Sequence, residues 1–179
     1  TPSPFSVVVL ISGSGSNLQA LIKSASEGGY RIAAVVSNKA DAFGLTRAKE
    51  AGIPTAVLSH LAYANREEFD SALTRIIDNF RPRLVVLAGF MRILSSAFVS
   101  HYAGRLINIH PSLLPDFPGI NTHQRALDAN VTRHGASVHF VTEELDGGPV
   151  IARHSIPVVP ADTPESLAAR VLEQEHTLY

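Results

Sequence analysis

Short apolar runs alternate along the first 110 residues with longer segments in which apolar residues recur every three or four positions. Uniformly apolar runs are typical of strands buried on both faces of a sheet, and the longer spacing is typical of amphipathic helices. The predicted strands are Phe5–Ile11, Ile32–Val36, Thr55–Leu58, Leu84–Leu87 and Arg105–Ile109. This alternation predicts a three-layer, Rossmann-like α/β fold, with a mostly parallel sheet and helices on both faces.

Residues that cap or interrupt helices mark the ends of the predicted helices. Gly28-Gly29 ends the helix after the first strand, and Asp41 can cap a second helix that ends at Gly52. Asn65-Arg66-Glu67-Glu68 resembles a capping box, and the amphipathic helix behind it ends at Arg81-Pro82. One helix therefore follows each of the first three strands, as the crossovers of a parallel sheet require.

The pattern changes after residue 110. A proline-rich stretch runs from Pro111 to Pro118, and a short helix is predicted for His123–Ala129. Ala136–Val141 and Val150–Val158 are predicted strands joined by a glycine-rich turn. Thr163-Pro164-Glu165 begins a final helix, with a capping residue, a proline and an acid in favourable positions.

Composition indicates a compact folded chain. Of the 179 residues, 45% are hydrophobic and 17% are charged, and the formal net charge is −1. This length and apolar content suit one catalytic domain over residues 1–179. The chain does not begin with Met and stops at Tyr179 inside a helical pattern, so we expect residues to be missing at both ends.

Charge and residue types exclude several classes of function. A net charge of −1 provides no basic surface for nucleic acid or an anionic membrane, and no apolar run reaches the roughly 18 residues that span a bilayer. The absence of cysteine excludes disulfides and thiol catalysis. We therefore expect a cytoplasmic protein that binds small molecules and neither nucleic acid nor a membrane. The sequence leaves open whether it is a monomer or a homodimer.

Eight histidines raise the question of a metal site. No His-Glu-x-x-His pattern occurs, and we expect no metal-dependent chemistry. His101, His123, His134 and His154 are expected at surface or loop positions, whereas His139 alternates with apolar neighbours and can point toward a site.

A glycine-rich loop, Gly13-Ser14-Gly15-Ser16-Asn17, separates the first strand from the first helix. Free backbone N–H groups at a helix start favour a phosphate, and glycines allow it to approach closely. Leu18 stands where the dinucleotide fingerprint has its third glycine, and no Gly-Lys-Ser/Thr completes a P-loop. A phosphate site and a simple capped turn both remain open.

Asn108 and His110 alternate with isoleucines at the end of a predicted strand, so they share one face. An amide beside an imidazole suits acyl transfer, because the amide can stabilise an oxyanion and the imidazole can move a proton. No Gly-x-Ser-x-Gly pattern supplies an enzyme nucleophile, which direct attack by a substrate amine would not need. The alternative is a histidine that only satisfies backbone groups at the strand end.

An acidic turn, Glu143-Glu144-Leu145-Asp146-Gly147-Gly148, joins the last two predicted strands. Asp-Gly is a favourable hairpin turn without any function. The functional interpretation places the carboxylate next to His110, where it would orient the imidazole. Both interpretations are compatible with the local sequence.

Several longer segments carry a family resemblance. They are Ile11–Ala20, Ser37–Ala42, Leu87–Leu94, Asn108-Ile109-His110-Pro111-Ser112-Leu113-Leu114-Pro115, Ser137–Val141, Asp146–Pro149 and Gln174–His176. In these segments the chain resembles the folate-dependent formyltransferases, and among them those that act on 5′-phosphoribosylglycinamide in purine synthesis. The resemblance extends over nearly the whole chain and implies 10-formyltetrahydrofolate as the formyl donor.

The resemblance also implies roles for individual residues. Asn108 and His110 would stabilise the oxyanion formed when the substrate amine attacks the formyl carbon, and Asp146 would support the imidazolium. The implied folate-binding residues are Arg66, Met91, Arg92, Ile93, Leu94, Asn108, Val141, Thr142, Glu143, Glu144, Leu145 and Asp146.

The acceptor substrate has its own implied contacts. Gly15, Ser16 and Asn17 would bind the 5′-phosphate, and Glu175 would contact the ribose or the glycinamide portion. Asp116-Phe117 stands where some relatives carry Lys-Tyr, so no phosphate-binding role is assigned there.

Three other functions remain to be distinguished. A formyltetrahydrofolate deformylase uses a similar Asn, His and Asp set with water as the acceptor. A methionyl-tRNA formyltransferase needs a basic tRNA-binding region, which the net charge of −1 disfavours. A non-catalytic nucleotide-binding module would explain the glycine-rich loop but not Asn108, His110 and Asp146.

Overall fold

The computed structural model describes residues 5–13, 15–28, 30–59, 63–90, 94–110, 112–114, 116–118, 121–142 and 148–178, and their side chains except at positions 16, 24, 26–28 and 173–178. The chain forms two compact units, Thr1–Ile107 (unit 1) and Asn108–Tyr179 (unit 2). The boundary lies inside a strand, and the single catalytic domain expected from the sequence stays a prediction.

Unit 1 is an alternation of strands and helices. Its elements are β1 (Phe5–Ile11), α1 (Ser16–Gly28), β2 (Tyr30–Ser37), α2 (Phe43–Glu50), β3 (Thr55–Val57), α3 (Arg66–Asn79), β4 (Leu84–Leu87), α4 (Ser96–His101) and the start of β5 (Leu106–His110). β1 pairs in parallel with β2 and β4, and β2 pairs in parallel with β3. Hydrogen bonding gives the order β3-β2-β1-β4, followed by β5.

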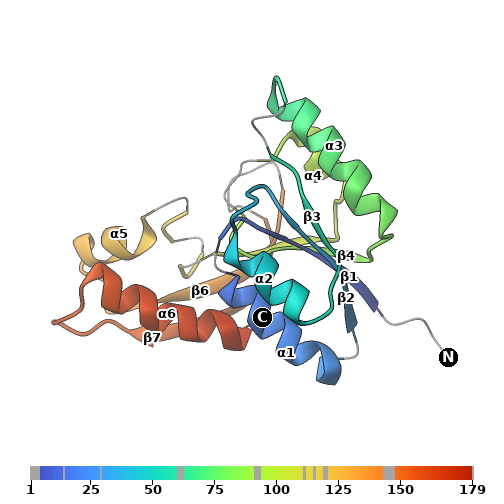
Figure 1. Cartoon of the computed structure of the whole chain (residues 1–179). Coiled ribbons are helices and arrows are strands. Elements are labelled where there is room, and N and C mark those ends of the chain that lie inside the picture. The colour runs from blue at the N-terminus through green and yellow to red at the C-terminus, as the bar shows by residue number, and fades with distance from the viewer. Residues whose placement is uncertain are drawn as a thin grey trace. The chain divides into compact units, whose positions relative to one another are not determined.

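The direction of the strand order reverses at β1, and this reversal sets the positions of the helices. Right-handed crossovers from β1 to β2 to β3 place α1 and α2 on one face, and the return to β4 places α3 on the other. Figure 1 shows α1 and α2 on the opposite side of these strands from α3 and α4. A doubly wound sheet binds its ligands outside the carboxyl ends of the strands at such a reversal, here β1 and β4.

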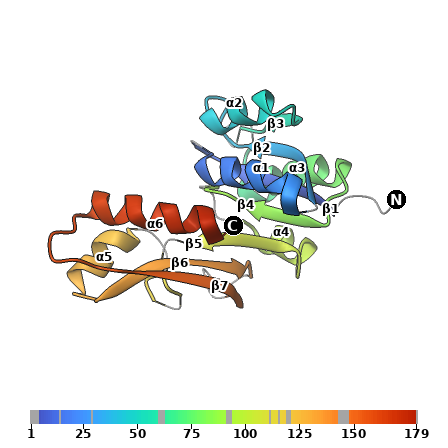
Figure 2. The same ribbon diagram turned by 90° about the horizontal axis from the view of Figure 1, so that it is seen from below.

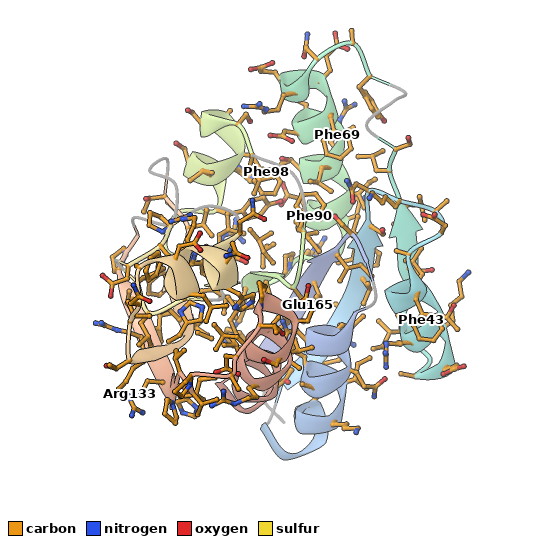
Figure 3. All side chains as sticks on the ribbon, turned by 90° about the vertical axis from the view of Figure 1, so that its left-hand side faces the viewer. Phe43, Phe69, Phe90, Phe98, Arg133 and Glu165 are labelled. Atoms are coloured by element: carbon orange, nitrogen blue, oxygen red, sulfur yellow. The ribbon has the colours of Figure 1, made fainter. Side chains whose placement is uncertain are left out.

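Apolar residues on both faces of β1 explain its central place. Val8, Val9, Leu10 and Ile11 are fully buried, as a strand covered by helices on both faces requires. Phe69 on α3 and Phe98 on α4 are also buried, and Figure 3 labels both in the layer that these helices form. The uniformly apolar runs of the sequence therefore correspond to the interior of the sheet.

Unit 2 contains the end of β5, α5 (Thr122–Asp128), β6 (Arg133–Phe140), β7 (Val150–Pro157) and α6 (Pro164–Leu178). β6 lies between β5 and β7 in the hydrogen-bonding order, and β6 pairs with β7 in antiparallel fashion. α6 packs on β6 and β7, as Figure 2 shows. Ser166 N donates to Thr163 Oγ1 at 3.2 Å, which confirms the predicted cap of the final helix.

The prediction of an α/β fold with a mostly parallel sheet is confirmed, but two local details differ. Ala42, and not Asp41, is the N-cap of α2, and no side chain caps that helix. Asn65 does cap α3, since its Oδ1 accepts from Glu68 N at 2.9 Å. The reciprocal bond of the capping box is shifted by one residue, because Glu68 Oε2 accepts from Ala64 N at 3.3 Å.

Candidate functional site

The glycine-rich loop after β1 packs backbone against backbone on the first turn of α2. Gly15 has a φ of 73°, and a Cβ placed on it would lie 2.6 Å from Gly44 Cα. A Cβ on Gly44 would in turn lie 2.5 Å from Ile11 Cδ1. Gly44 N donates to Gly13 O at 3.1 Å and ties the two segments together. Gly15 is therefore required both by its close approach to the Gly44 backbone and by its left-handed conformation, while a side chain on Gly44 would force Ile11 to move.

The same loop presents the start of α1. Gln19 N donates to Gly15 O at 2.8 Å, so the helix begins directly behind the glycine. The amide groups of a first helical turn have no acceptor within the helix, and they attract anions. Asn17 is buried there, and its Oδ1 has no hydrogen-bond partner among the described residues. The Ser16 side chain and Ser14 lie outside the described residues.

Arg47 adds a positive charge beside this helix start. Its Cδ would lie 3.5 Å from a Cβ on Gly15, and its Nη1 donates to Gln19 Oε1 at 3.5 Å. Its guanidinium also lies over the Phe43 ring, 4.9 Å from the centroid. A cation and a helix N-terminus together favour a bound anion. No local sequence pattern marks Arg47 as a site residue, because only the packing of α2 against the loop places it there.

Replacing Gly15 with alanine should destabilise the loop. Gly52→Ala is a matched control, since Gly52 has a φ of 74° and a methyl group added to it would have no atom within 4 Å. The control should lose only the left-handed preference, about 1 kcal/mol of unfolding free energy, whereas Gly15→Ala should lose on the order of 2 kcal/mol or more. Denaturant unfolding measures both. Equal losses would show that the contact with Gly44 carries no strain.

The segment after β4 is described only in part. Met91, Arg92 and Ile93 lie outside the described residues, while Leu94 is half-buried. Directly after it, Ser95 N donates to the buried Asp70 Oδ2 at 2.6 Å, and Ser95 Oγ accepts from Phe98 N at 3.3 Å. These bonds connect α3 to the start of α4. They hold the backbone at Ser95, directly after the predicted folate-binding residue Leu94.

The end of β5 contains the buried imidazole of unit 2. His110 is 5% exposed, and its Nε2 lies 2.8 Å from Phe117 O. A carbonyl oxygen can only accept a hydrogen bond, so Nε2 carries a proton and donates a hydrogen bond to Phe117 O. In the neutral ring the second nitrogen, Nδ1, then carries no proton. Asn108 is half-buried on the same strand, two residues earlier.

The loop that supplies this carbonyl is held by serine hydroxyls. Ser112 Oγ donates to Asp116 O at 2.6 Å. Ser137 Oγ on β6 donates to Ser112 O at 2.7 Å and accepts from Leu114 N at 2.9 Å. Ser112 and Ser137 are fully buried, so these bonds satisfy backbone groups that water cannot reach. The loop is thereby fixed on β6.

Two further histidines lie near His110. His123 Nδ1 and His134 Nε2 are 3.2 Å apart, and the Phe117 ring meets the His134 ring edge-on with centroids 6.0 Å apart. Burial lowers the pKa of His134 to about 4, and neighbouring histidine charges add to the effect. Burial and the charge of His110 also lower the pKa of His123. The expectation that His134 lies at the surface is wrong, because it is 1% exposed on β6.

The low pKa of His134 predicts that acid destabilises unit 2. The unfolded chain binds a proton on this residue below its ordinary pKa of 6.5, whereas the folded chain does not until about 4. The unfolding free energy is therefore unaffected by this residue above pH 6.5. It falls by on the order of 1 to 3 kcal/mol as the pH drops from 6.5 toward 4. Denaturant unfolding at several pH values measures this loss.

His134→Gln removes the titrating group but keeps a polar partner for His123. The variant should lose less unfolding free energy than the wild type between pH 6.5 and 4. His154→Gln, at a half-buried position on β7, is the control and should behave like the wild type. An identical pH dependence in His134→Gln and wild type would contradict the assignment.

The remaining predicted site residues are described unevenly. Arg66 is exposed in the first turn of α3, Val141 is half-buried and Thr142 is exposed. Glu143, Glu144, Leu145 and Asp146 lie outside the described residues, as does the side chain of Glu175. His139 is buried on β6 and its Nδ1 donates to Phe140 O at 2.9 Å.

Other features of the described residues add little to the site. A cleft of about 720 Å³ in unit 1 is lined by Tyr30, Ile53, Phe80 and neighbouring residues, and by none of the predicted site residues. No helix in the described ranges has the length and apolar character needed to cross a membrane. Within the same ranges, no group of three His, Asp or Glu side chains is arranged to hold a metal ion.

Comparison with known proteins gives consistent matches. The sequence model of a family described as formyl transferase matches residues 5–179. Phosphoribosylglycinamide formyltransferase of Escherichia coli (strain K12) is 57% identical over 175 residues, which cover 97% of this chain and 82% of that protein.

Solved structures give the same result. That of the phosphoribosylglycinamide formyltransferase from Coxiella burnetii, in complex with CHES, has a TM-score of 0.94 at 54% identity, covering 99% of this chain and 84% of that one. Glycinamide ribonucleotide transformylase 1 from Symbiobacterium toebii has a TM-score of 0.96 at 42% identity, covering 100% and 85%.

Proposed function

This chain belongs to the formyl transferase family, and we propose that it transfers the formyl group of 10-formyltetrahydrofolate to the glycinamide amine of 5′-phosphoribosylglycinamide. The observation that carries the proposal is the 57% identity, over 97% of the chain, to an enzyme named for that acceptor. A buried imidazole with a defined protonated nitrogen at the end of β5 supports it chemically. The reaction belongs to de novo purine synthesis.

The proposed reaction needs no covalent enzyme intermediate. The amine nitrogen attacks the formyl carbon, and the carbonyl electrons move onto oxygen to give a tetrahedral oxyanion. The Asn108 amide and a protonated His110 stabilise that charge, and Asp146 supports the imidazolium. The carbon–nitrogen bond to the folate then breaks. The proton lost by the amine replaces the formyl group on the folate nitrogen, through His110, Asp146 and water.

In this reaction the proton on His110 Nε2 stays on that nitrogen, in its hydrogen bond to Phe117 O. The nitrogen and the oxygen are 2.8 Å apart. The proton that is exchanged during the reaction is therefore the one on Nδ1. A fixed imidazole offers its proton without reorganising when charge develops, which is the basis of electrostatic catalysis.

The 5′-phosphate of the acceptor is proposed to bind at the start of α1. Gly15 and Ser16 offer backbone N–H groups, and Asn17 offers a buried side-chain amide. The helix dipole and Arg47 favour the negative charge. Glu175 is proposed to contact the ribose or the glycinamide portion.

The reduced folate is proposed to bind to three segments. They are Arg66 on α3, Met91 to Leu94 after β4, and Val141 to Asp146 after β6. Apolar side chains at Met91, Ile93 and Leu94 suit the flat pteridine, while backbone groups read its edge. We also propose that the protein acts in the cytoplasm, as a monomer or homodimer, without nucleic-acid or membrane partners.

Turnover should depend on both His110 and the amine substrate. His110→Ala should lower turnover by on the order of a hundredfold or more, because a general acid is lost. His101→Ala is the control, since His101 is exposed on α4 and pairs with Asp78 at the surface. Release of tetrahydrofolate, followed with and without 5′-phosphoribosylglycinamide, measures the reaction.

The two readouts separate the alternatives. Equally fast release without the amine would contradict amine formylation and would instead indicate a deformylase. Normal turnover in His110→Ala would contradict the role of the imidazole while leaving the substrates unaffected. Binding of the nucleotide with no turnover under any condition would indicate a nucleotide-binding module.

A further inference from the structure

Phe117 has a backbone conformation that its side chain does not favour. Its φ is 50°, in the left-handed region that non-glycine residues other than Asn and Asp rarely adopt. Its carbonyl oxygen accepts the hydrogen bond from His110 Nε2. Strained residues of this kind persist only when surrounding contacts hold them, and they are often found at functional sites. The contacts that hold Phe117 therefore bear on His110.

Arg125 supplies two of these contacts. Its Nη1 donates to Pro118 O at 2.6 Å, and its guanidinium lies over the Phe117 ring, 5.6 Å from the centroid. One planar side chain thus holds the ring of Phe117 and the carbonyl of the next residue. The peptide that carries the His110 acceptor lies between these two points.

The helix that carries Arg125 is itself anchored. α5 buries Thr122 and Ala126, and Arg125 N donates to Asn121 O at 3.0 Å in its first turn. Because α5 is anchored, the Arg125 guanidinium is held in one place against the loop. The exposed face of α5 has a different interaction, in which Gln124 Nε2 donates to Asp128 Oδ1 at 2.7 Å.

We propose that Arg125 is a positioning residue for His110. By holding Phe117 and Pro118, it keeps the Phe117 carbonyl on Nε2 and fixes the orientation of the imidazole, with Nδ1 as the nitrogen that exchanges protons. The inference rests on the proposed role of His110. A purely structural role, in which Arg125 only stabilises α5 and the loop, is the alternative.

Arg125→Met keeps most of the aliphatic part of the side chain. It removes the guanidinium, and with it the hydrogen bond to Pro118 O and the contact with the Phe117 ring. We expect kcat to fall by about tenfold, because a small displacement of a reacting group is costly, with KM for both substrates within about twofold of the wild type. Arg133→Met is the matched control. Arg133 donates to Ser155 Oγ at 2.8 Å from its place on β6, labelled in Figure 3, and its loss should leave kcat unchanged.

A double variant distinguishes positioning from general stabilisation. In a His110→Ala background, Arg125→Met should have no further effect on the residual turnover, because its action passes through the missing imidazole. An equal fall in both backgrounds would overturn the proposal and indicate a structural role. Circular dichroism and thermal unfolding would establish that each variant is folded.

Arg125→Lys provides a second variant if Arg125→Met does not fold. Lysine can donate to Pro118 O but lacks the planar guanidinium over the Phe117 ring, so kcat should lie between those of wild type and Arg125→Met. A kcat for Arg125→Lys and Arg125→Met equal to that of Arg133→Met would overturn the proposal even if His110→Ala is inactive. Full activity of His110→Ala would instead overturn the proposed role of His110, on which this inference rests.

Discussion

The hydrogen bond from His110 Nε2 to the Phe117 carbonyl is the constraint on which the proposed chemistry depends. A buried imidazole must satisfy its polar nitrogens, and a carbonyl acceptor leaves no choice of which one is protonated. Phe117 provides that acceptor only in a left-handed conformation, with φ at 50°. The serine bonds within the proline-rich loop and the contacts of Arg125 offset the cost of this conformation, on the order of 1 to 2 kcal/mol.

The loop of unit 1 that is proposed to bind the 5′-phosphate is constrained in a different way. There the constraint is steric, since the loop after β1 approaches α2 so closely that a Cβ on Gly15 would lie 2.6 Å from the backbone of Gly44. The close approach fixes the start of α1, whose first amide groups have no acceptor within the helix. Arg47 lies against the same loop and adds charge where the helix dipole already favours an anion. Binding a phosphate at this position would require little rearrangement of the protein.

The sequence predicted those features that depend on local pattern. β1 and β4 were recognisable because their residues are apolar on both faces, and Asn65 and Thr163 were recognisable as caps because their side chains act within one turn. Asp41 failed as a cap because the helix begins one residue later than its side chain could serve. Asn108 and His110 were selected correctly as neighbours on one strand, although their chemical roles stay predictions.

Features that depend on tertiary contacts could not be predicted. Nothing in the sequence around His134 distinguishes a buried histidine on β6 from an exposed one, and its low pKa follows only from burial beside His123. Phenylalanine has no preference for a positive φ, so the conformation of Phe117 had no local signal. Arg47 and Arg125 act through partners on other segments, Gln19 and Pro118. Such contacts exist only once the loops and helices have packed.

The protonation of the His110 side chain tests this account most directly. Nitrogen-15 NMR of the imidazole distinguishes the two neutral tautomers. The account predicts that neutral His110 carries its proton on Nε2. A neutral imidazole protonated on Nδ1 would contradict it, because Nε2 could then donate no hydrogen bond to the Phe117 carbonyl.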